Sequence, residues 1–248
     1  MSGILAGRTA IVTGGGSGFG AGIVARFAAE GARVMVADIN SDSAGAVADS
    51  VAGIACAVDV SDAASVAAMA ASARAAFGTP DILVNNAGIT HVAGPMEDVE
   101  EAMFDRVMAV NNKAVYLAAR QFVPAMKAAG RGVILNIAST AGVSPRPNLS
   151  WYNASKGWMI TATRAMAVEL APFGIRVNAV NPVAGETPLL ASFMGEDTPE
   201  MRERFLSTIP LGRFSKPADI AAAALFLCSD DASMITGVAM EVDGGRCI

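Results

Sequence analysis

The chain has 248 residues, of which 53% are hydrophobic, and a formal net charge of −5, which favours a folded globular protein over a disordered one. Its acidic sequence pI near 4.9 and the lack of any lysine and arginine cluster argue against nucleic-acid binding. Cys56, Cys228 and Cys247 are far apart and odd in number, so we expect a reducing compartment and neither a disulfide framework nor a metal site.

The N-terminal residues lead directly into a strand-like run, without the basic patch and long apolar stretch of a signal peptide. No later apolar run reaches the length of a membrane span. We therefore expect a soluble, cytoplasmic protein that does not contact a membrane.

Short β-branched runs alternate along the chain with longer alanine-rich stretches. The runs that predict strands are residues 9–13, 33–38, 54–59, 82–85, 133–137, 176–181 and 238–242. The stretches that predict helices are residues 18–31, 62–77, 99–129, 152–170 and 217–229, with Ser61 as an N-cap and Gly31, Gly78, Gly130 and Gly174 at helix ends. This alternation is typical of an α/β fold, a doubly wound parallel seven-stranded sheet with helices on both faces.

No linker or repeat divides the chain, so residues 1–248 are expected to form a single domain. Only residues 188–212 interrupt the alternation. Their mixture of apolar and charged side chains suits a substrate lid, although an ordinary surface excursion explains the composition equally well.

The glycine-rich segment TGGGSGFG, residues 13–20, follows the first predicted strand and opens the first predicted helix. Glycines allow a tight turn and close approach of a pyrophosphate to the helix N-terminus, as in Rossmann-type dinucleotide-binding folds, although glycines also make turns without a ligand. Asp38 ends the second strand, where a carboxylate can accept hydrogen bonds from the adenosine ribose. No arginine beside Asp38 offers a partner to the 2′-phosphate of NADP, so NAD is the expected cofactor.

Polar or small residues also follow the third and fourth strands, namely Asp59, Val60 and the run Asn85-Asn86-Ala87-Gly88. Each could be simple turn chemistry. Their recurrence at successive carboxyl ends, where open α/β sheets bind ligands, favours a binding site.

Tyr152 and Lys156 are four residues apart at the start of a predicted helix, so they share one face. Such a pair taken alone is usually a surface feature. Ser139 lies just beyond a strand end, where its hydroxyl can point into the same cleft. Hydride transfer needs an acid/base for the hydroxyl proton, and a tyrosine with a lowered pKa beside a lysine can act as one.

These residues, together with the glycine segment, the NNAG run and Asn111 in VNNKAVY, make the whole chain resemble the short-chain dehydrogenase/reductase family. The resemblance implies Asn111, Ser139, Tyr152 and Lys156 as catalytic residues, with Asn111 preferred to Asn112. It implies that Lys156 also binds the nicotinamide ribose and that Asn111 supports a proton-relay water. The cofactor-binding residues it implies, together with those predicted above, are Gly14, Ser17, Gly18, Phe19, Gly20, Asp38, Ile39, Asp59, Val60, Asn86, Ala87, Gly88, Tyr152, Lys156, Pro182 and Thr187.

Two positions depart from the family pattern. Val183 replaces the usual glycine of the Pro-Gly motif after the sixth strand, and Phe19 stands where isoleucine is common. Neither departure removes a functional group.

The candidate substrate residues, chosen by position, are His91, Ser139, Thr140, Trp151, Glu186 and Leu190. For His91, the sole histidine, an exposed loop position is favoured over a role as base, because Tyr152 already fills that role. The expected reaction is NAD-dependent interconversion of a secondary alcohol, including a cyclic one, with its ketone. The alternatives are an NADPH-dependent 3-oxoacyl-thioester reductase and a non-catalytic dinucleotide-binding protein. The resemblance also implies a homotetramer paired through residues 99–129 and 152–170.

Overall fold

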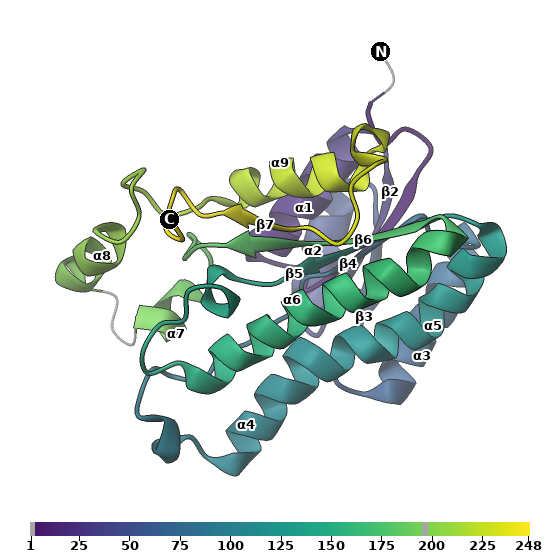
Figure 1. The fold of residues 1–248 in the computed structure, drawn as a ribbon. Coiled ribbons are helices and arrows are strands. Elements are labelled where there is room, and N and C mark those ends of the chain that lie inside the picture. Colours follow the sequence, from purple (N-terminus) through teal and green to yellow (C-terminus); the bar gives the residue numbers. More distant parts are fainter. Residues whose placement is uncertain (1–2, 195–197) are drawn as a thin grey trace.

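The computed structural model describes residues 3–194 and 198–248, and a seven-stranded sheet lies at its centre (Figure 1). Its strands are β1 (Thr9–Thr13), β2 (Arg33–Asp38), β3 (Ile54–Ala57), β4 (Ile82–Asn85), β5 (Gly132–Ile137), β6 (Ile175–Pro182) and β7 (Ala239–Val242). All neighbours are parallel, in the order β3-β2-β1-β4-β5-β6-β7. The predicted doubly wound α/β fold is therefore confirmed.

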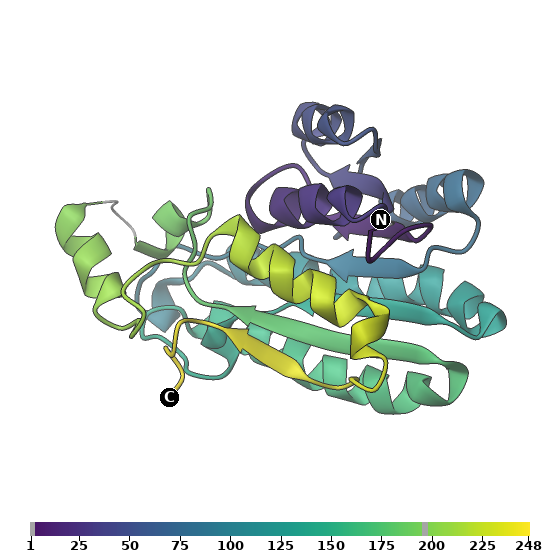
Figure 2. The same cartoon turned by 90° about the horizontal axis from the view of Figure 1, so that it is seen from above.

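Helices cover both faces of the sheet, as Figure 2 shows from above. One face carries α1 (Gly18–Ala29), α2 (Ser41–Ser50) and α9 (Pro217–Cys228), and the other carries α3 (Ala63–Phe77), α5 (Ala114–Ala129) and α6 (Ser150–Leu170). Helix α4 (Glu101–Met108) packs against α6. The 188–212 segment contains α7 (Leu190–Met194) and α8 (Pro199–Leu206), which extend beyond the sheet (Figure 2).

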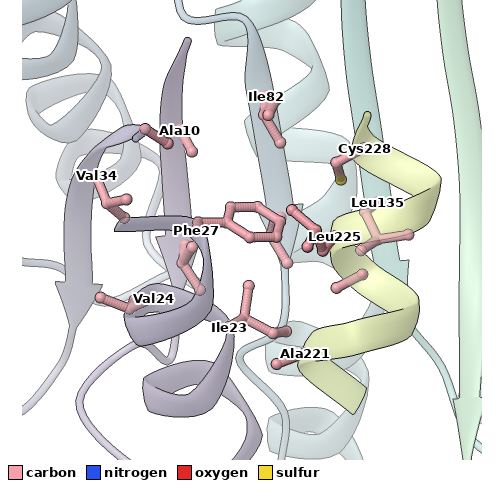
Figure 3. Packing of buried hydrophobic residues seen from close by; sticks show 14 of the residues in the cluster. Ala10, Ile23, Val24, Phe27, Val34, Ile82, Leu135, Ala221, Leu225 and Cys228 are labelled. Carbon is pink, nitrogen blue, oxygen red and sulfur yellow. The ribbon is translucent and has the colours of Figure 1, made fainter. Parts of the chain in front are cut away.

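On the sheet face that carries α1, α2 and α9, helices α1 and α9 pack side by side on the strands (Figure 3). Phe27 of α1, Leu225 of α9 and Leu135 of β5 meet in one buried cluster. Burying such side chains stabilises the fold by about 2 kcal/mol each. This packing holds the β1 end, where the glycine turn begins, in a fixed position.

Several predicted boundaries were wrong. Helix α2 was not predicted, and the single helix expected over 99–129 is a series of segments, with the 3-10 turn η1 (Met96–Asp98) before α4 and the π-helical turn η2 (Ala109–Lys113) between α4 and α5. The N-cap of α3 is Asp62, whose carboxylate accepts from Ser65 N at 2.7 Å, and not Ser61. Gly31, Gly78, Gly130 and Gly174 do end helices and have positive φ.

Candidate active site

A cleft of about 430 Å³ opens at the carboxyl ends of the strands. It spans β1 and β4, where the strand order reverses, which is the usual ligand site of such sheets. The sequence-predicted residues that line it are Gly14, Ser17, Gly18, Phe19, Asp38, Ile39, Asp59, Val60, Asn86, Ala87, Gly88, Ser139, Thr140, Tyr152, Lys156, Pro182 and Thr187. Gly20, His91, Asn111, Trp151, Glu186 and Leu190 are not among its lining residues.

The glycine turn is packed so closely that two of its positions have no room for a side chain. A Cβ on Gly14 would lie 2.8 Å from the Ala87 Cα, and one on Gly20 would lie 2.0 Å from the Gly14 carbonyl oxygen. Ser17, the N-cap of α1, is in an extended conformation, and its hydroxyl does not accept from a backbone amide of the helix. The first backbone N–H groups of α1 therefore have no side-chain acceptor at the cap. This arrangement fits a dinucleotide pyrophosphate.

Hydrogen bonds fix the residues around the turn. Asp38 accepts from Gly16 N at 2.9 Å and from Asn40 N at 3.0 Å, one bond to each carboxylate oxygen. Asn86 donates through Nδ2 to the carbonyls of Thr13 and Gly14 at 2.9 and 3.0 Å. The Asp38 carboxylate is therefore held at the end of the cleft formed by β2.

Asp59 is held in its charged form by Ser61. Its Oδ1 accepts from the Ser61 hydroxyl at 2.6 Å and from Ser61 N at 2.9 Å, and these bonds lower the pKa of Asp59. The carboxylate thus remains ionised at the rim near β3.

Tyr152, Lys156 and Ser139 meet in the same cleft. The Lys156 ammonium lies 5.8 Å from the Tyr152 ring centroid and donates to the Ile137 carbonyl at 2.9 Å. Ser139 caps a short 3-10 turn by accepting from Ala141 N at 3.0 Å. Because α6 supplies the first two residues and the end of β5 supplies the third, two rigid elements hold all three groups.

Burial shifts the pKa values of Tyr152 and Lys156. Desolvation raises the pKa of Tyr152 to about 12, with a hydrogen bond to Ser139 acting in the opposite direction. Desolvation also lowers the pKa of Lys156 to about 8. At neutral pH the phenol is therefore protonated and the ammonium is still largely charged.

Asn111 sits in the π-helical turn between α4 and α5 and is fully buried. Its amide accepts from Ile89 N at 2.9 Å and donates to Ile89 O at 3.0 Å and to the Ser155 hydroxyl at 2.9 Å. Its neighbour Asn112 donates to the Ser155 carbonyl at 2.8 Å. Asn111 thus ties the segment after the NNAG run to α6, next to Lys156.

The two departures from the family pattern are accommodated by packing. Gly185 makes room for Phe19, because a Cβ there would lie 2.3 Å from the Phe19 ring. Val183 is buried in an apolar cluster with Leu190, Met194, Ile209 and Phe214.

Several substrate candidates lie elsewhere. The expectation of an exposed His91 was wrong, because the residue is 2% exposed and its Nδ1 lies 2.8 Å from the Val92 carbonyl. Trp151 packs edge-on against Phe104 and donates to the Met96 carbonyl at 3.0 Å. Glu186 is exposed, and Leu190 belongs to the Val183 cluster.

Among the residues that line the cleft and that sequence reasoning missed are Arg146, Leu149 and Phe205. Two of them lie on the segment joining Ser139 to Tyr152. Since both ends of that segment were expected at the cleft, its intervening residues could have been proposed as lining residues.

Within residues 3–194 and 198–248, no group of three or more His, Cys, Asp or Glu side chains could hold a metal ion. No helix in that part of the chain is both long and apolar enough to cross a membrane.

Comparisons with known proteins agree with this geometry. Residues 14–246 match the family model described as Enoyl-(Acyl carrier protein) reductase. The 4-formylbenzenesulfonate dehydrogenase of Comamonas testosteroni is 51% identical, covering 97% of this chain and 98% of its own. The 2-dehydro-3-deoxy-L-rhamnonate dehydrogenase (NAD(+)) of a Sphingomonas species is 39% identical, covering 99% of this chain and 98% of its own.

Among solved structures, the 3-ketoacyl-(acyl-carrier-protein) reductase from Brucella melitensis, complexed with NADH, superposes with a TM-score of 0.94. It is 51% identical, and the match covers 98% of this chain and all of the other. Together with the family model and the curated relatives, this match shows that the chain belongs to the short-chain dehydrogenase/reductase family of oxidoreductases.

Proposed function

We propose that the chain is an NAD-dependent dehydrogenase that interconverts a secondary alcohol, including a cyclic one, with its ketone. The observation that carries this proposal is that Tyr152, Ser139 and Lys156 line the same cleft as the glycine turn. A proton-transfer group is thereby held beside a dinucleotide-sized site.

The cofactor residues fit this proposal. The glycine turn and the start of α1 would hold the pyrophosphate, Asp38 the adenosine ribose, and Pro182 and Thr187 the nicotinamide end. Asp38 supports NAD over NADP, since it would repel a 2′-phosphate. Two similar proteins agree with this preference: the Sphingomonas dehydrogenase has NAD(+) in its name, and the Brucella melitensis structure is a complex with NADH.

Tyr152 would take the proton from the substrate hydroxyl. Bringing its pKa from about 12 to neutrality needs a shift of about five units, or about 7 kcal/mol of differential stabilisation. The Lys156 cation and the Ser139 hydroxyl both favour the phenolate or the developing alkoxide. The bound nicotinamide supplies the hydride acceptor or donor. Asn111 would act as a positioning residue through Ile89 and Ser155, and its support of a proton-relay water follows from the family resemblance.

Part of the cleft beside Tyr152 is apolar and suits a ring or an alkyl group of the substrate. Ala141 and Leu149 pack around Tyr152, and Phe193 of α7 lies edge-on to the tyrosine at 5.1 Å between ring centroids. We therefore propose that residues 188–212 form the substrate lid of a single domain spanning residues 1–248. Leu190, Met194 and Ile209 of this segment are buried against Val183 and Phe214, which lie just before and just after it in the chain.

A second candidate reaction is reduction of a 3-oxoacyl thioester, because the Brucella melitensis structure carries that name. The NADPH form of this alternative is disfavoured by Asp38. Comparing turnover of a 3-oxoacyl thioester and of simple ketones separates the two candidates.

We also propose a cytoplasmic homotetramer. Helices α5 and α6 leave large side chains exposed, among them Tyr116, Trp158 and Val168. Such exposed apolar side chains on neighbouring helices suit a contact between subunits. Light scattering after size-exclusion chromatography should give four chains, and a monomer would contradict this proposal.

The test of the function is Tyr152→Phe, with Tyr116→Phe as a matched control at an exposed position of α5. Removing the acid/base should reduce turnover by about 10²- to 10⁴-fold, whereas NADH binding, followed by fluorescence, should not change. The control should keep full activity. Unchanged turnover in Tyr152→Phe would exclude Tyr152 as the acid/base, and absence of turnover with every substrate in the wild type would favour a non-catalytic binding protein.

A further inference from the structure

Arg146 is a charged residue that lines the same cleft as the apolar residues Leu149, Phe193 and Phe205. It lies between the 3-10 turn η3 (Thr140–Gly142) and α6. Its carbonyl accepts from Asn153 Nδ2 at 2.7 Å, which fixes the segment to the helix that carries Tyr152. The guanidinium carbon lies 4.4 Å from the centre of the Phe205 ring, and Phe205 also lines the cleft.

The charge on Arg146 has no carboxylate partner among the residues that the structure describes. By contrast, Arg8, Arg131 and Arg213 all pair with aspartates. The contacts of Arg146 are weaker, namely the Phe205 ring, 4.4 Å from the guanidinium carbon, and the Thr208 hydroxyl at 3.4 Å. A half-buried cation without a counter-charge is costly, and an anionic ligand would remove that cost.

A second guanidinium adds to the positive potential. Arg246 donates to the Ser144 hydroxyl at 3.0 Å, and its buried Nε has no hydrogen-bond partner. Burial and the nearby Arg246 charge together lower the pKa of Arg146 to about 10. Arg146 therefore stays charged at neutral pH beside a like charge, which further favours an anion.

The fold separates Arg146 from the part of the cleft that suits the pyrophosphate. The glycine turn follows β1, whereas Arg146 lies in the segment between η3 and α6 that follows β5, two strand positions away in the sheet. The contacts with Phe205 and Thr208 hold the guanidinium on the side of α8, within the 188–212 segment. An anion bound there belongs to the substrate and not to the dinucleotide.

We propose that Arg146 is a specificity residue that binds a carboxylate or sulfonate on the substrate, at a position separated from the reacting carbon by an apolar spacer. This inference rests on the proposed function, since it assigns the substrate class of the same cleft. The planar guanidinium can donate two parallel hydrogen bonds to either anion. Leu149, Phe193 and Phe205 provide the apolar surface for a ring or short alkyl spacer.

The test uses three probe alcohols that differ only in one substituent, namely 1-phenylethanol and its para-sulfonate and para-carboxylate derivatives. With NAD, the wild type should give kcat/KM values about 10- to 100-fold higher for the two anions than for the neutral alcohol. Raising the salt concentration should increase KM for the anions alone. The relative rates of the sulfonate and the carboxylate identify the preferred anion.

Arg146→Gln should lose the anion preference and keep its rate with 1-phenylethanol within about threefold, while Arg146→Lys should retain part of the preference. Arg204→Gln, which removes an exposed charge from α8 and does not line the cleft, is the matched control and should behave as wild type. The neutral substrate reports whether the variants fold.

Binding separates failure of this inference from failure of the proposed function. Calorimetry with the NADH-loaded protein should show that 4-acetylbenzenesulfonate or 4-acetylbenzoate binds more tightly than acetophenone, and that Arg146→Gln abolishes the difference. Arg146-dependent binding without turnover supports the anion site and contradicts the proposed reaction. Equal binding of the charged and neutral ketones, or an anion preference that survives in Arg146→Gln, overturns the inference.

Discussion

Asp38 is the residue whose replacement should change cofactor choice. A unit negative charge on Asp38 and one on a 2′-phosphate about 4 Å away would repel by about 4 kcal/mol at an effective dielectric constant of about 20. Because Asp38 is half-buried at the rim of the cleft, solvent and salt reduce this to about 2 kcal/mol. That energy corresponds to about a 30-fold preference for NADH over NADPH.

Asp38→Asn should bring the ratio of the two dissociation constants close to one. The variant should also bind NADH several-fold more weakly, because the amide keeps one acceptor oxygen for the two backbone donors, Gly16 N and Asn40 N. Fluorescence titration with both reduced cofactors measures the ratio. Asp42→Asn, an equal charge change at an exposed position of α2, is the control. A wild type that binds NADPH more tightly, or an unchanged ratio in Asp38→Asn, would refute this account.

Three further predictions concern packing and protonation. Gly20→Ala should weaken NADH binding at least about tenfold in the same titration, because the added Cβ would clash with the Gly14 carbonyl oxygen. In the control Gly45→Ala the added Cβ meets nothing within 4 Å, and this variant should bind NADH as tightly as the wild type. Asn136→Ala should lower the free energy of unfolding in urea by about 1–3 kcal/mol. The buried Asn136 side chain accepts from Asn85 Nδ2 and donates to the Thr163 hydroxyl, each at 2.8 Å, so unchanged stability would contradict this prediction. The pKa of Lys156 is about 8 in the folded chain against an ordinary 10.5, so the unfolded chain binds more protons between these values and stability should rise with pH there. Measured in urea, the free energy of unfolding of the wild type relative to that of Lys156→Met should rise by about 2 kcal/mol from about pH 7.5 to 9.5. The same difference between the two proteins at both pH values would show that Lys156 is not desolvated.

The strands and the glycine turn could be predicted because their signals are local. Strands that are buried on both faces are mostly apolar, as in the fully buried β1 (TAIVT) and β4 (ILVN). Helix α2 gave no such signal, since its sequence SDSAGAVADS is polar and contains glycine. Its formation depends on the Asn40 cap, which accepts from Ser43 N at 2.9 Å, and on Ala44 and Ala48 packing against the sheet.

The site could be predicted only in part, because some of its geometry depends on contacts between distant residues. Tyr152 and Lys156 share a helix face, so their proximity follows from spacing. The π-helical turn that carries Asn111 has no simple sequence pattern, and it is held by hydrogen bonds to Ile89 and Ser155. Burial of His91 and exposure of Arg146 to the cleft depend likewise on how loops fold over the sheet.

The apolar cluster of Val183, Leu190, Met194, Ile209 and Phe214 is distinct from the two clusters that pack helices on the sheet. We expect replacements in this small core to change first how α7 packs beside the cleft. Substitutions at sites without shared neighbours act nearly additively on stability. Natural or laboratory selection for a new substrate can therefore accumulate changes in this cluster without replacing Ser139, Tyr152 or Lys156, none of which belongs to it.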